Sequence, residues 1–280
     1  MTRIRILAAL IMAPVAIAAI LLLPSQWLAA AAAAVVLVGL WEWLKLAGVE
    51  DTLARATLLL LNLVLMVLVS WDRDASLFLF RVAALAGVGW WLLALAWLRF
   101  FDFGAEPDSP ARVLKLLGGT LAVLPAWASL VLIHASGEQG HLWLLTALAV
   151  VWAADSGAYF AGRAFGRHKL APRVSPNKTW EGLAGGLLAG VLVATAFAFG
   201  LGVPGWRLLA VAQLPWLLLV TVATVFASVL GDLFESLLKR HAGAKDSGNV
   251  IPGHGGVLDR VDGVLAALPV FAIGKEIFGL

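Results

Sequence analysis

Long apolar runs separated by short polar segments occupy almost the whole chain. Each run is about 15 to 22 residues long, and about 20 apolar residues cross the hydrocarbon core of a bilayer as a helix. The runs do not alternate between apolar and polar positions, as the strands of a membrane barrel would. We place them at residues 6–23, 27–41, 53–70, 77–98, 113–134, 141–161, 183–203, 208–230 and 263–280. The pattern predicts an all-α, polytopic membrane protein with about nine transmembrane helices.

The composition agrees with this architecture. Hydrophobic residues make up 62% of the 280 residues and charged residues 13%, whereas water-soluble domains carry about 45–50% and about 25%. The excess is spread over the whole chain, which argues against a soluble enzyme with one membrane anchor. Cysteine is absent, which excludes disulfides, thiolate metal sites and a cysteine nucleophile. The net charge of +3 gives no indication of nucleic acid as a partner.

The positions of lysine and arginine predict the orientation of the bundle. With the N-terminus in the cytoplasm, sixteen of the 20 positive residues fall on the cytoplasmic side, and only Arg73, Arg81, Arg207 and Lys275 fall outside. Cytoplasmic loops carry an excess of positive charge, so we expect this orientation, with both long polar segments inside. The first apolar run is too long for the apolar region of a signal peptide, so we expect an uncleaved helix.

Tryptophan residues recur near the ends of the predicted spans. An indole ring is amphipathic and is enriched where a membrane meets water. We therefore expect an interfacial belt that includes Trp41, Trp43, Trp90, Trp91 and Trp206.

A stripe of glycines marks the start of the seventh run. Gly182, Gly186 and Gly190 recur every four residues, so one face of that helix has almost no side chain. The stripe predicts close helix packing, either within the chain or between protomers.

The first polar segment, residues 155–182, carries five lysine or arginine residues and two carboxylates. Asp155 lies near the inner end of an apolar run, where a carboxylate costs about 2.5–3.5 kcal/mol on insertion scales, so it needs a partner. The stretch from Ser175 to Thr179 includes Lys178 but lacks the spacing of a Walker A loop. If this segment binds a nucleotide, it does so without a Walker A loop. The alternative is that the segment is a plain cytoplasmic connector without a functional site.

The second polar segment, residues 232–262, holds five carboxylates, four lysine or arginine residues and two histidines. If the eighth helix continues into the cytoplasm, Asp232, Glu235, Ser236 and Lys239 form one stripe on one face. A simple surface salt bridge between Glu235 and Lys239 is the alternative. Near the end of the segment, two more aspartates three residues apart, at 259 and 262, can also share a helix face.

Between these two helical stretches lies a glycine-rich loop, residues 245–256. Its glycine density indicates a tight loop whose backbone N–H groups can approach an anion. His254 lies between two glycines, and we expect it to act as a phosphate donor or a structural clamp. The other four histidines are expected to be ordinary loop or interface residues.

The residue types in both segments indicate a chemistry. Carboxylate oxygens without cysteine suit Mg²⁺ rather than zinc. Lysine and arginine beside them suit phosphates, whose charge must be offset in phosphoryl or nucleotidyl transfer. A transporter uses the same residue types, but it places them near the middle of the membrane rather than in loops. The sequence therefore favours a metal-assisted reaction on anionic phosphates at the inner leaflet.

The 27 residues from Ser236 to Asp262 resemble the signature of the phosphatidate cytidylyltransferases, also called CDP-diacylglycerol synthases, without a departure. The segment from Asp155 to Glu181 resembles bacterial members of the same family. Before Asp155 the resemblance rests on hydropathy alone. A match of this length is far more specific than a lone glycine motif.

The resemblance implies transfer of CMP from CTP to phosphatidic acid, which yields CDP-diacylglycerol and pyrophosphate. It implies a multi-pass enzyme of the bacterial inner membrane that needs Mg²⁺, with room for a second cation, and that forms a homodimer. By the same resemblance, Asp232 and Asp259 match the metal ligands. Catalytic roles fall on these two aspartates with Lys239, Asp246 and Lys245, and substrate-binding roles on Ser175, Lys178, Ser236, Arg240, His254, Arg260 and Asp262.

The mechanism that we expect is an in-line attack of the lipid phosphate on the α-phosphorus of CTP. We expect one structural unit, in which residues 1–140 supply packing and dimerisation and residues 141–280 carry the site. Two alternatives stay open at this point. The acceptor could be another lipid phosphate, such as an archaeal ether lipid or a polyprenyl phosphate, or the protein could transport an anionic metabolite.

Overall fold

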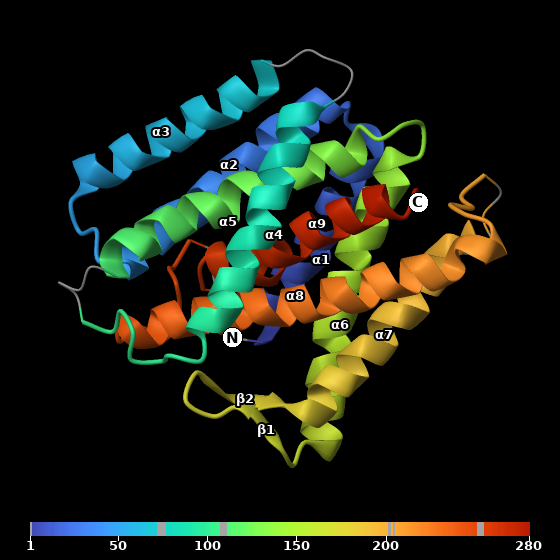
Figure 1. The fold of residues 1–280 in the computed structure, drawn as a ribbon. Helices are drawn as coiled ribbons and strands as arrows, with labels where there is room; N and C mark the ends of the chain where they lie inside the picture. The colour runs from blue at the N-terminus through green and yellow to red at the C-terminus, as the bar shows by residue number, and fades with distance from the viewer. Residues whose placement is uncertain (1, 72–76, 107–110, 201–202, 204, 251–254) are drawn as a thin grey trace.

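The computed structural model describes residues 2–71, 77–106, 111–200, 203, 205–250 and 255–280, with side chains from Met12 onward. Within these residues the chain forms nine α-helices and one short β-hairpin (Figure 1). The helices are α1 (Thr2–Leu22), α2 (Ser25–Leu46), α3 (Thr52–Trp71), α4 (Phe78–Trp97), α5 (Ala111–His134), α6 (Gly140–Phe165), α7 (Trp180–Ala198), α8 (Leu214–His241) and α9 (Leu258–Ile277). The strands are β1 (Lys169–Ala171) and β2 (Ser175–Thr179).

Each of the nine apolar runs coincides with one helix, so the prediction of a polytopic helical bundle is confirmed. Seven of the described helices, α2 to α8, are long and apolar enough to cross a membrane. The helix α9 is not among them, and it carries Asp259, Arg260 and Asp262 in its first two turns. The helix α8 runs on to His241, well beyond the end of its apolar run, as the stripe of polar residues requires.

The hairpin is an addition that the hydropathy pattern did not predict. The strands β1 and β2 are antiparallel, with Lys169 opposite Thr179 and Ala171 opposite Ser175. The strand β1 has only three residues, and β2, with the sequence Ser-Pro-Asn-Lys-Thr, has no alternation of apolar and polar residues. The segment that we expected to be a loop is therefore partly ordered by backbone pairing.

The start of α7 is fixed by two side chains. The backbone N–H of Gly182 donates to the hydroxyl oxygen of Thr179 over 3.1 Å, which is an N-cap. Glu181 accepts hydrogen bonds from the backbone N–H groups of Arg167 and His168 and lies 2.6 Å from the His168 ring nitrogen Nδ1. These contacts set the path from the end of α6 through the hairpin into α7.

The glycine stripe packs within the chain. Figure 1 shows α7 alongside α6, and a Cβ at Gly186 would lie 2.8 Å from the carbonyl oxygen of Ala154 on α6. A Cβ at Gly182 would meet α6 in the same way, and one at Gly190 would lie 2.9 Å from the side chain of Val225 on α8. The predicted close packing is confirmed, and its partners are α6 and α8.

An aromatic cluster fills the bundle where α2, α4 and α8 meet. Its centre is Phe234 of α8, which is fully buried, and its ring centroid lies 5.6–6.1 Å from those of four tryptophans. These tryptophans are Trp43, Trp90, Trp91 and Trp97. The prediction of an interfacial position is therefore wrong for Trp43, Trp90 and Trp91, because all three are buried in the core.

The polar atoms of two of these indoles are satisfied inside the protein. The N–H of Trp43 donates to the carbonyl oxygen of Lys115 over 2.8 Å, and the N–H of Trp91 donates to that of Leu265 over 3.1 Å. An indole that finds such a partner can be buried without a polar cost. Position near the end of an apolar run is therefore a poor guide to exposure here.

The helices α8 and α9 approach each other at two glycines. A Cβ at Gly231 of α8 would overlap the carbonyl oxygen of Asp262 on α9, and a Cβ at Gly263 would lie 2.6 Å from the hydroxyl oxygen of Ser228. The two backbones can touch only because these positions lack side chains. The contact places the first turns of α9 beside the second half of α8.

We predict that Gly231→Ala destabilises the protein, because the added methyl group must push α8 and α9 apart. Overpacking of this kind costs about 1–3 kcal/mol. The matched control is Gly89→Ala in α4, where an added Cβ would meet nothing within 4 Å. Thermal unfolding in detergent should show a lower midpoint for the first variant and not for the second. Equal midpoints would contradict the close contact.

Candidate active site

The two polar segments meet at one end of the bundle, where α6 and α8 end and α7 and α9 begin. The ammonium nitrogen of Lys178, on β2, lies 2.6 Å from Oδ2 of Asp232 on α8. Arg240, near the end of α8, donates from Nε to the carbonyl oxygen of Val174 in the hairpin over 3.3 Å. The hairpin is thus tied to α8 by one ion pair and one hydrogen bond.

Lys239 joins α8 to α9. Its ammonium nitrogen lies 2.5 Å from Oε2 of Glu235 and 2.7 Å from Oδ1 of Asp259. The exposed fraction of the side chain is 13% for Lys239, 1% for Glu235 and 7% for Asp259, so all three are largely buried. A buried charge needs a partner, and here one lysine serves two carboxylates. The predicted stripe on α8 is present, and the pair of Glu235 with Lys239 is buried rather than a surface salt bridge.

The glycine-rich loop holds the second oxygen of Asp259. This oxygen, Oδ2, accepts hydrogen bonds from the backbone N–H and the hydroxyl group of Ser247, both at 2.9 Å, and from the N–H of Gly256 at 2.8 Å. Gly255 has a φ of +84°, and a Cβ there would lie 2.9 Å from the same oxygen. The loop was expected to bind an anion through its backbone, and one anion that it binds is the protein's own carboxylate.

These contacts keep Asp259 ionised. Burial raises the pKa of its carboxyl group, but the hydrogen bonds from Lys239, Gly256 and Ser247 outweigh this effect and lower the pKa to about 2. The group is therefore a carboxylate at neutral pH.

A second group of carboxylates surrounds Asp232. Asp155 on α6 lies within electrostatic range of Asp232, and also of Lys178 and Arg260. Asp262 on α9 lies within range of Asp232 and Asp155, and its Oδ1 accepts the N–H of Gly263 at 2.8 Å. From the sequence we expected Asp155 to need a partner, and Lys178 and Arg260 supply positive charge near it.

The donor set of this end of the bundle fits Mg²⁺ in its chemistry. Mg²⁺ prefers oxygen ligands and usually takes one or two carboxylates together with substrate phosphates and water. Among the described residues, no three histidine, cysteine, aspartate or glutamate side chains lie close enough to form a complete metal site.

The remaining predicted residues lie around this centre. Ser236 donates from its hydroxyl group to Oδ1 of Asp232 over 3.4 Å. Lys245 and Asp246 are exposed on the loop, and Arg260 is exposed on α9. Ser175, the first residue of β2, is half-buried. The predicted residue His254 lies outside the described part of the chain.

Three histidines have structural contacts, as we expected of them. His134 is hydrogen-bonded to Ser25 and to the carbonyl oxygen of Ile20. His241 lies 2.6 Å from the carbonyl oxygen of Phe101, and the ring of His168 contacts a glutamate of α7, as described above.

One residue that the sequence analysis missed lies next to Asp259. Glu42, on α2, is only 3% exposed, and its carboxylate accepts a hydrogen bond from the hydroxyl group of Ser247 at 3.0 Å. An acidic residue at the edge of an apolar run was the available signal. Hydropathy could not show which distant loop it meets.

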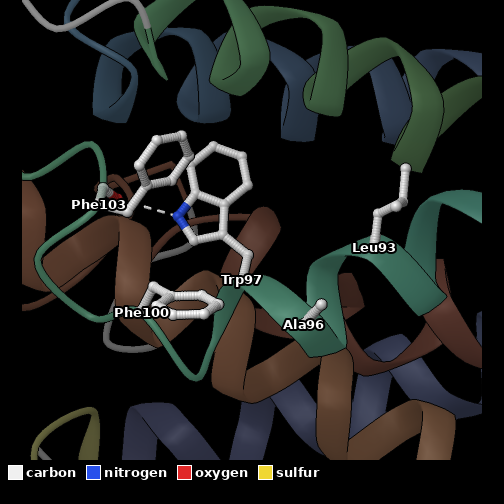
Figure 2. Close-up of a pocket in the computed structure, with 5 residues that line it drawn as sticks. All are labelled: Leu93, Ala96, Trp97, Phe100 and Phe103. Carbon is white, nitrogen blue, oxygen red and sulfur yellow. Dashed lines mark hydrogen bonds between the residues drawn. The ribbon is translucent and has the colours of Figure 1, made fainter.

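An apolar cavity of about 330 Å³ lies at the end of α4. Figure 2 shows its lining, in which the indole N–H of Trp97 donates to the carbonyl oxygen of Phe103 over 2.9 Å. The other lining residues are Leu93, Ala96 and Phe100. None of the five is charged, so this cavity does not suit a phosphate, and the charged cluster is the candidate site.

The fold and the site together define a polytopic membrane protein with lysines and carboxylates gathered at one end of its bundle. The model of the cytidylyltransferase family matches residues 3–278. The chain therefore belongs to this family, and it is an enzyme of the nucleotidyltransferase class. The resemblance that we identified from the sequence is confirmed.

Similar proteins carry a common name. A phosphatidate cytidylyltransferase of Pseudomonas aeruginosa is 42% identical over 278 residues, which cover 96% of this chain and 94% of that protein. The phosphatidate cytidylyltransferase of Haemophilus influenzae is 37% identical over 280 residues, which cover 96% of both chains. That of Bacillus subtilis is 46% identical over 136 residues, which cover 47% of this chain and 46% of that protein.

We predict that Lys239→Met destabilises the protein, because it leaves Glu235 and Asp259 buried without their shared cation. Breaking a buried pair in this way costs about 3–5 kcal/mol. Lys245→Met removes the same charge from an exposed loop position, where substitutions change stability by about 0.5 kcal/mol or less. Unfolding midpoints of both variants in detergent check the difference. A midpoint for Lys239→Met as high as that of the control would show that the pairing is not structural.

Proposed function

We propose that the protein transfers CMP from CTP to phosphatidic acid and forms CDP-diacylglycerol and pyrophosphate. The observation that carries this proposal is the cluster in which Lys178 faces Asp232 and Lys239 faces Asp259 at one end of a membrane bundle. Such a cluster offers positive groups for phosphates and carboxylates for a divalent cation. The names of the similar bacterial proteins support CTP and phosphatidic acid as the two substrates.

The reaction is an in-line displacement at phosphorus. An oxygen of the lipid phosphate forms a bond with the α-phosphorus of CTP, while the bond from that phosphorus to the bridging oxygen of pyrophosphate breaks. The electron pair of the broken bond leaves with pyrophosphate. No protein nucleophile is needed, because the lipid phosphate itself supplies the attacking oxygen.

Positive side chains around the cluster bind the phosphates and offset their charge. We assign this role to Lys178, Lys239, Lys245, Arg240 and Arg260. Two of these lysines are paired with carboxylates in the structure, and the loop lysine and both arginines have exposed side chains. The exposed groups can meet the substrates first, and the paired lysines lie closest to the carboxylates.

The carboxylates of Asp232 and Asp259 would hold Mg²⁺. A bound divalent cation would supply positive charge to the phosphate oxygens. Asp155 and Asp262 place two further carboxyl groups within electrostatic range of Asp232, and these groups would be available to a second cation. Asp246 lies exposed on the same loop as Ser247, where it can help to attract the cation.

The remaining assignments concern substrate binding. Ser175 on β2 and Ser236 on α8 would hydrogen-bond substrate oxygens through their hydroxyl groups. Asp262 would bind substrate through the cation. We propose a phosphate contact for His254 from its place in the family signature.

We further propose that the enzyme resides in the bacterial inner membrane with its site and N-terminus facing the cytoplasm, where CTP is available. The excess of lysine and arginine on that side supports the orientation, and the similar bacterial proteins support the setting. A homodimer is proposed from the family resemblance.

The function is tested with labelled CTP, detergent-dispersed phosphatidic acid and Mg²⁺. We expect a lipid-soluble cytidine product, its loss when EDTA is added and its return with excess Mg²⁺. A polyprenyl phosphate in place of phosphatidic acid should give no product. If only the polyprenyl phosphate gave product, the acceptor would be that lipid and not phosphatidic acid. If proteoliposomes showed flux of an anion and no lipid-linked cytidine formed, the protein would be a transporter and the proposed reaction would be wrong.

We predict that Asp232→Asn and Asp259→Asn each remove nearly all activity, by about 10²-fold or more, a loss typical of removing one charge-stabilising group from an active site. The substitution keeps the shape of the side chain and removes its charge. Lys45→Ala is the control, because Lys45 is exposed at the end of α2. Rates are compared at equal amounts of folded protein. Near-normal turnover of either asparagine variant would end its assignment as a metal ligand.

A further inference from the structure

Glu42 is a buried carboxylate in an apolar helix. It lies in the last two turns of α2 and is 3% exposed, between two tryptophans. A carboxylate within a membrane helix costs about 2.5–3.5 kcal/mol on insertion scales. The structure must therefore offset this charge, and its contacts show how.

The first contact is with the start of α9. Oε1 of Glu42 accepts the backbone N–H of Val257 at 3.2 Å, and Oε2 accepts that of Leu258 at 2.8 Å. The first N–H groups of a helix have no partner within the helix, and Val257, which precedes α9, provides no side-chain cap. Negative charge is favourable at this position. Glu42 thus caps α9 from a helix more than 200 residues earlier in the chain.

The second contact is with Ser247. Its hydroxyl oxygen lies 3.0 Å from Oε2 of Glu42 and 2.9 Å from Oδ2 of Asp259. A serine hydroxyl has one proton, so it donates to one carboxylate at a time. The backbone N–H of Asp259 in turn donates to the same hydroxyl oxygen over 3.3 Å. Ser247 therefore couples the position of Glu42 to that of Asp259.

Two described residues of the loop that lie against the Glu42 carboxylate are glycines. A Cβ at Gly248 would overlap the Glu42 carboxylate, and a Cβ at Gly256 would overlap that carboxylate and the Ser247 hydroxyl oxygen. Two glycines of the family signature are thus explained by the space that Glu42 occupies. The loop and α2 are shaped to each other.

We propose that Glu42 is a positioning residue of the active site, which holds Ser247 and the first turn of α9 so that Asp259 keeps one oxygen on the loop and turns the other toward Lys239. It acts through Ser247 and the α9 backbone. The inference rests on the proposed function in one respect, namely that Asp259 takes part in the reaction. It predicts that the N-terminal half of the chain contributes to turnover through this one side chain.

The test compares Glu42→Gln with wild type. The amide keeps the shape of the side chain but loses the charge and one acceptor atom. We expect kcat to fall about 10–100-fold, as is typical for residues that orient a metal ligand, with a much smaller change in the KM for CTP, because Glu42 is placed against the loop and not the substrates. We also expect faster hydrogen exchange at the amides of Val257 and Leu258, a readout that needs no substrate.

Two further variants make the comparison specific. Glu50→Gln removes the same charge from an exposed position just after α2 and should leave kcat and exchange unchanged. Ser247→Ala should lower kcat in the same manner as Glu42→Gln. If both act on Asp259 by one route, the double variant should lose much less than the product of the two single losses.

The outcomes separate this inference from the proposed function. Wild-type kcat and wild-type exchange in folded Glu42→Gln would overturn the positioning role, and fully multiplicative losses in the double variant would overturn the route through Ser247. If Glu42→Gln does not fold, Ser247→Ala decides, because a wild-type kcat in that variant overturns the role and a lowered kcat supports it. Absence of product from wild type would refute the proposed function, and the exchange measurement would still test the positioning of α9.

Discussion

The close contact between α8 and α9 determines where the charged groups of this protein lie. Because Gly231 and Gly263 have no side chains, the two backbones can touch beside Asp262. That contact sets α9 at a depth where the ammonium group of Lys239 reaches Asp259 while it also holds Glu235. If the helices stood a side chain further apart, Asp259 on α9 would lose its ion pair with Lys239 on α8.

The same region shows how an apolar bundle accommodates charge. The helix α8 directs Phe234 into the tryptophan cluster and the adjacent Glu235 toward Lys239. Asp232, one turn earlier, is paired with Lys178 from the hairpin. The aromatic rings fix the position of α8, and the lysines neutralise the carboxylates that the helix brings into a poorly hydrated region. Packing and charge pairing therefore depend on different faces of one helix.

Hydropathy predicted the parts of the fold that depend on local sequence. The nine helices follow from the apolar runs, and the stripe from Asp232 to Lys239 follows from helical periodicity. The hairpin was not predictable in this way, since its strands are short and one contains Pro176. Trp43 and Trp90 were assigned to the interface because they lie at the ends of runs, but the ring of Phe234 draws them into the core.

The candidate site also has some residues that the sequence predicts and others that depend on contacts between distant segments. The carboxylates and lysines of the signature could be identified from the sequence because they are dense polar residues in an apolar chain. Glu42 was harder to identify: its place at the edge of an apolar run was the one signal, and two of its partners are the backbone N–H groups of Val257 and Leu258, which any sequence would offer. Only the folded chain shows that the glycines at 248 and 256 make space for it.

The bond network around Glu42 also limits how the chain can be divided or can diverge. A fragment that begins at residue 141 would retain the whole signature, yet the Ser247 hydroxyl and the first amides of α9 would have lost their acceptor on α2. Loss of the carboxylate at position 42 would therefore affect a loop and a helix that lie more than 200 residues later in the chain.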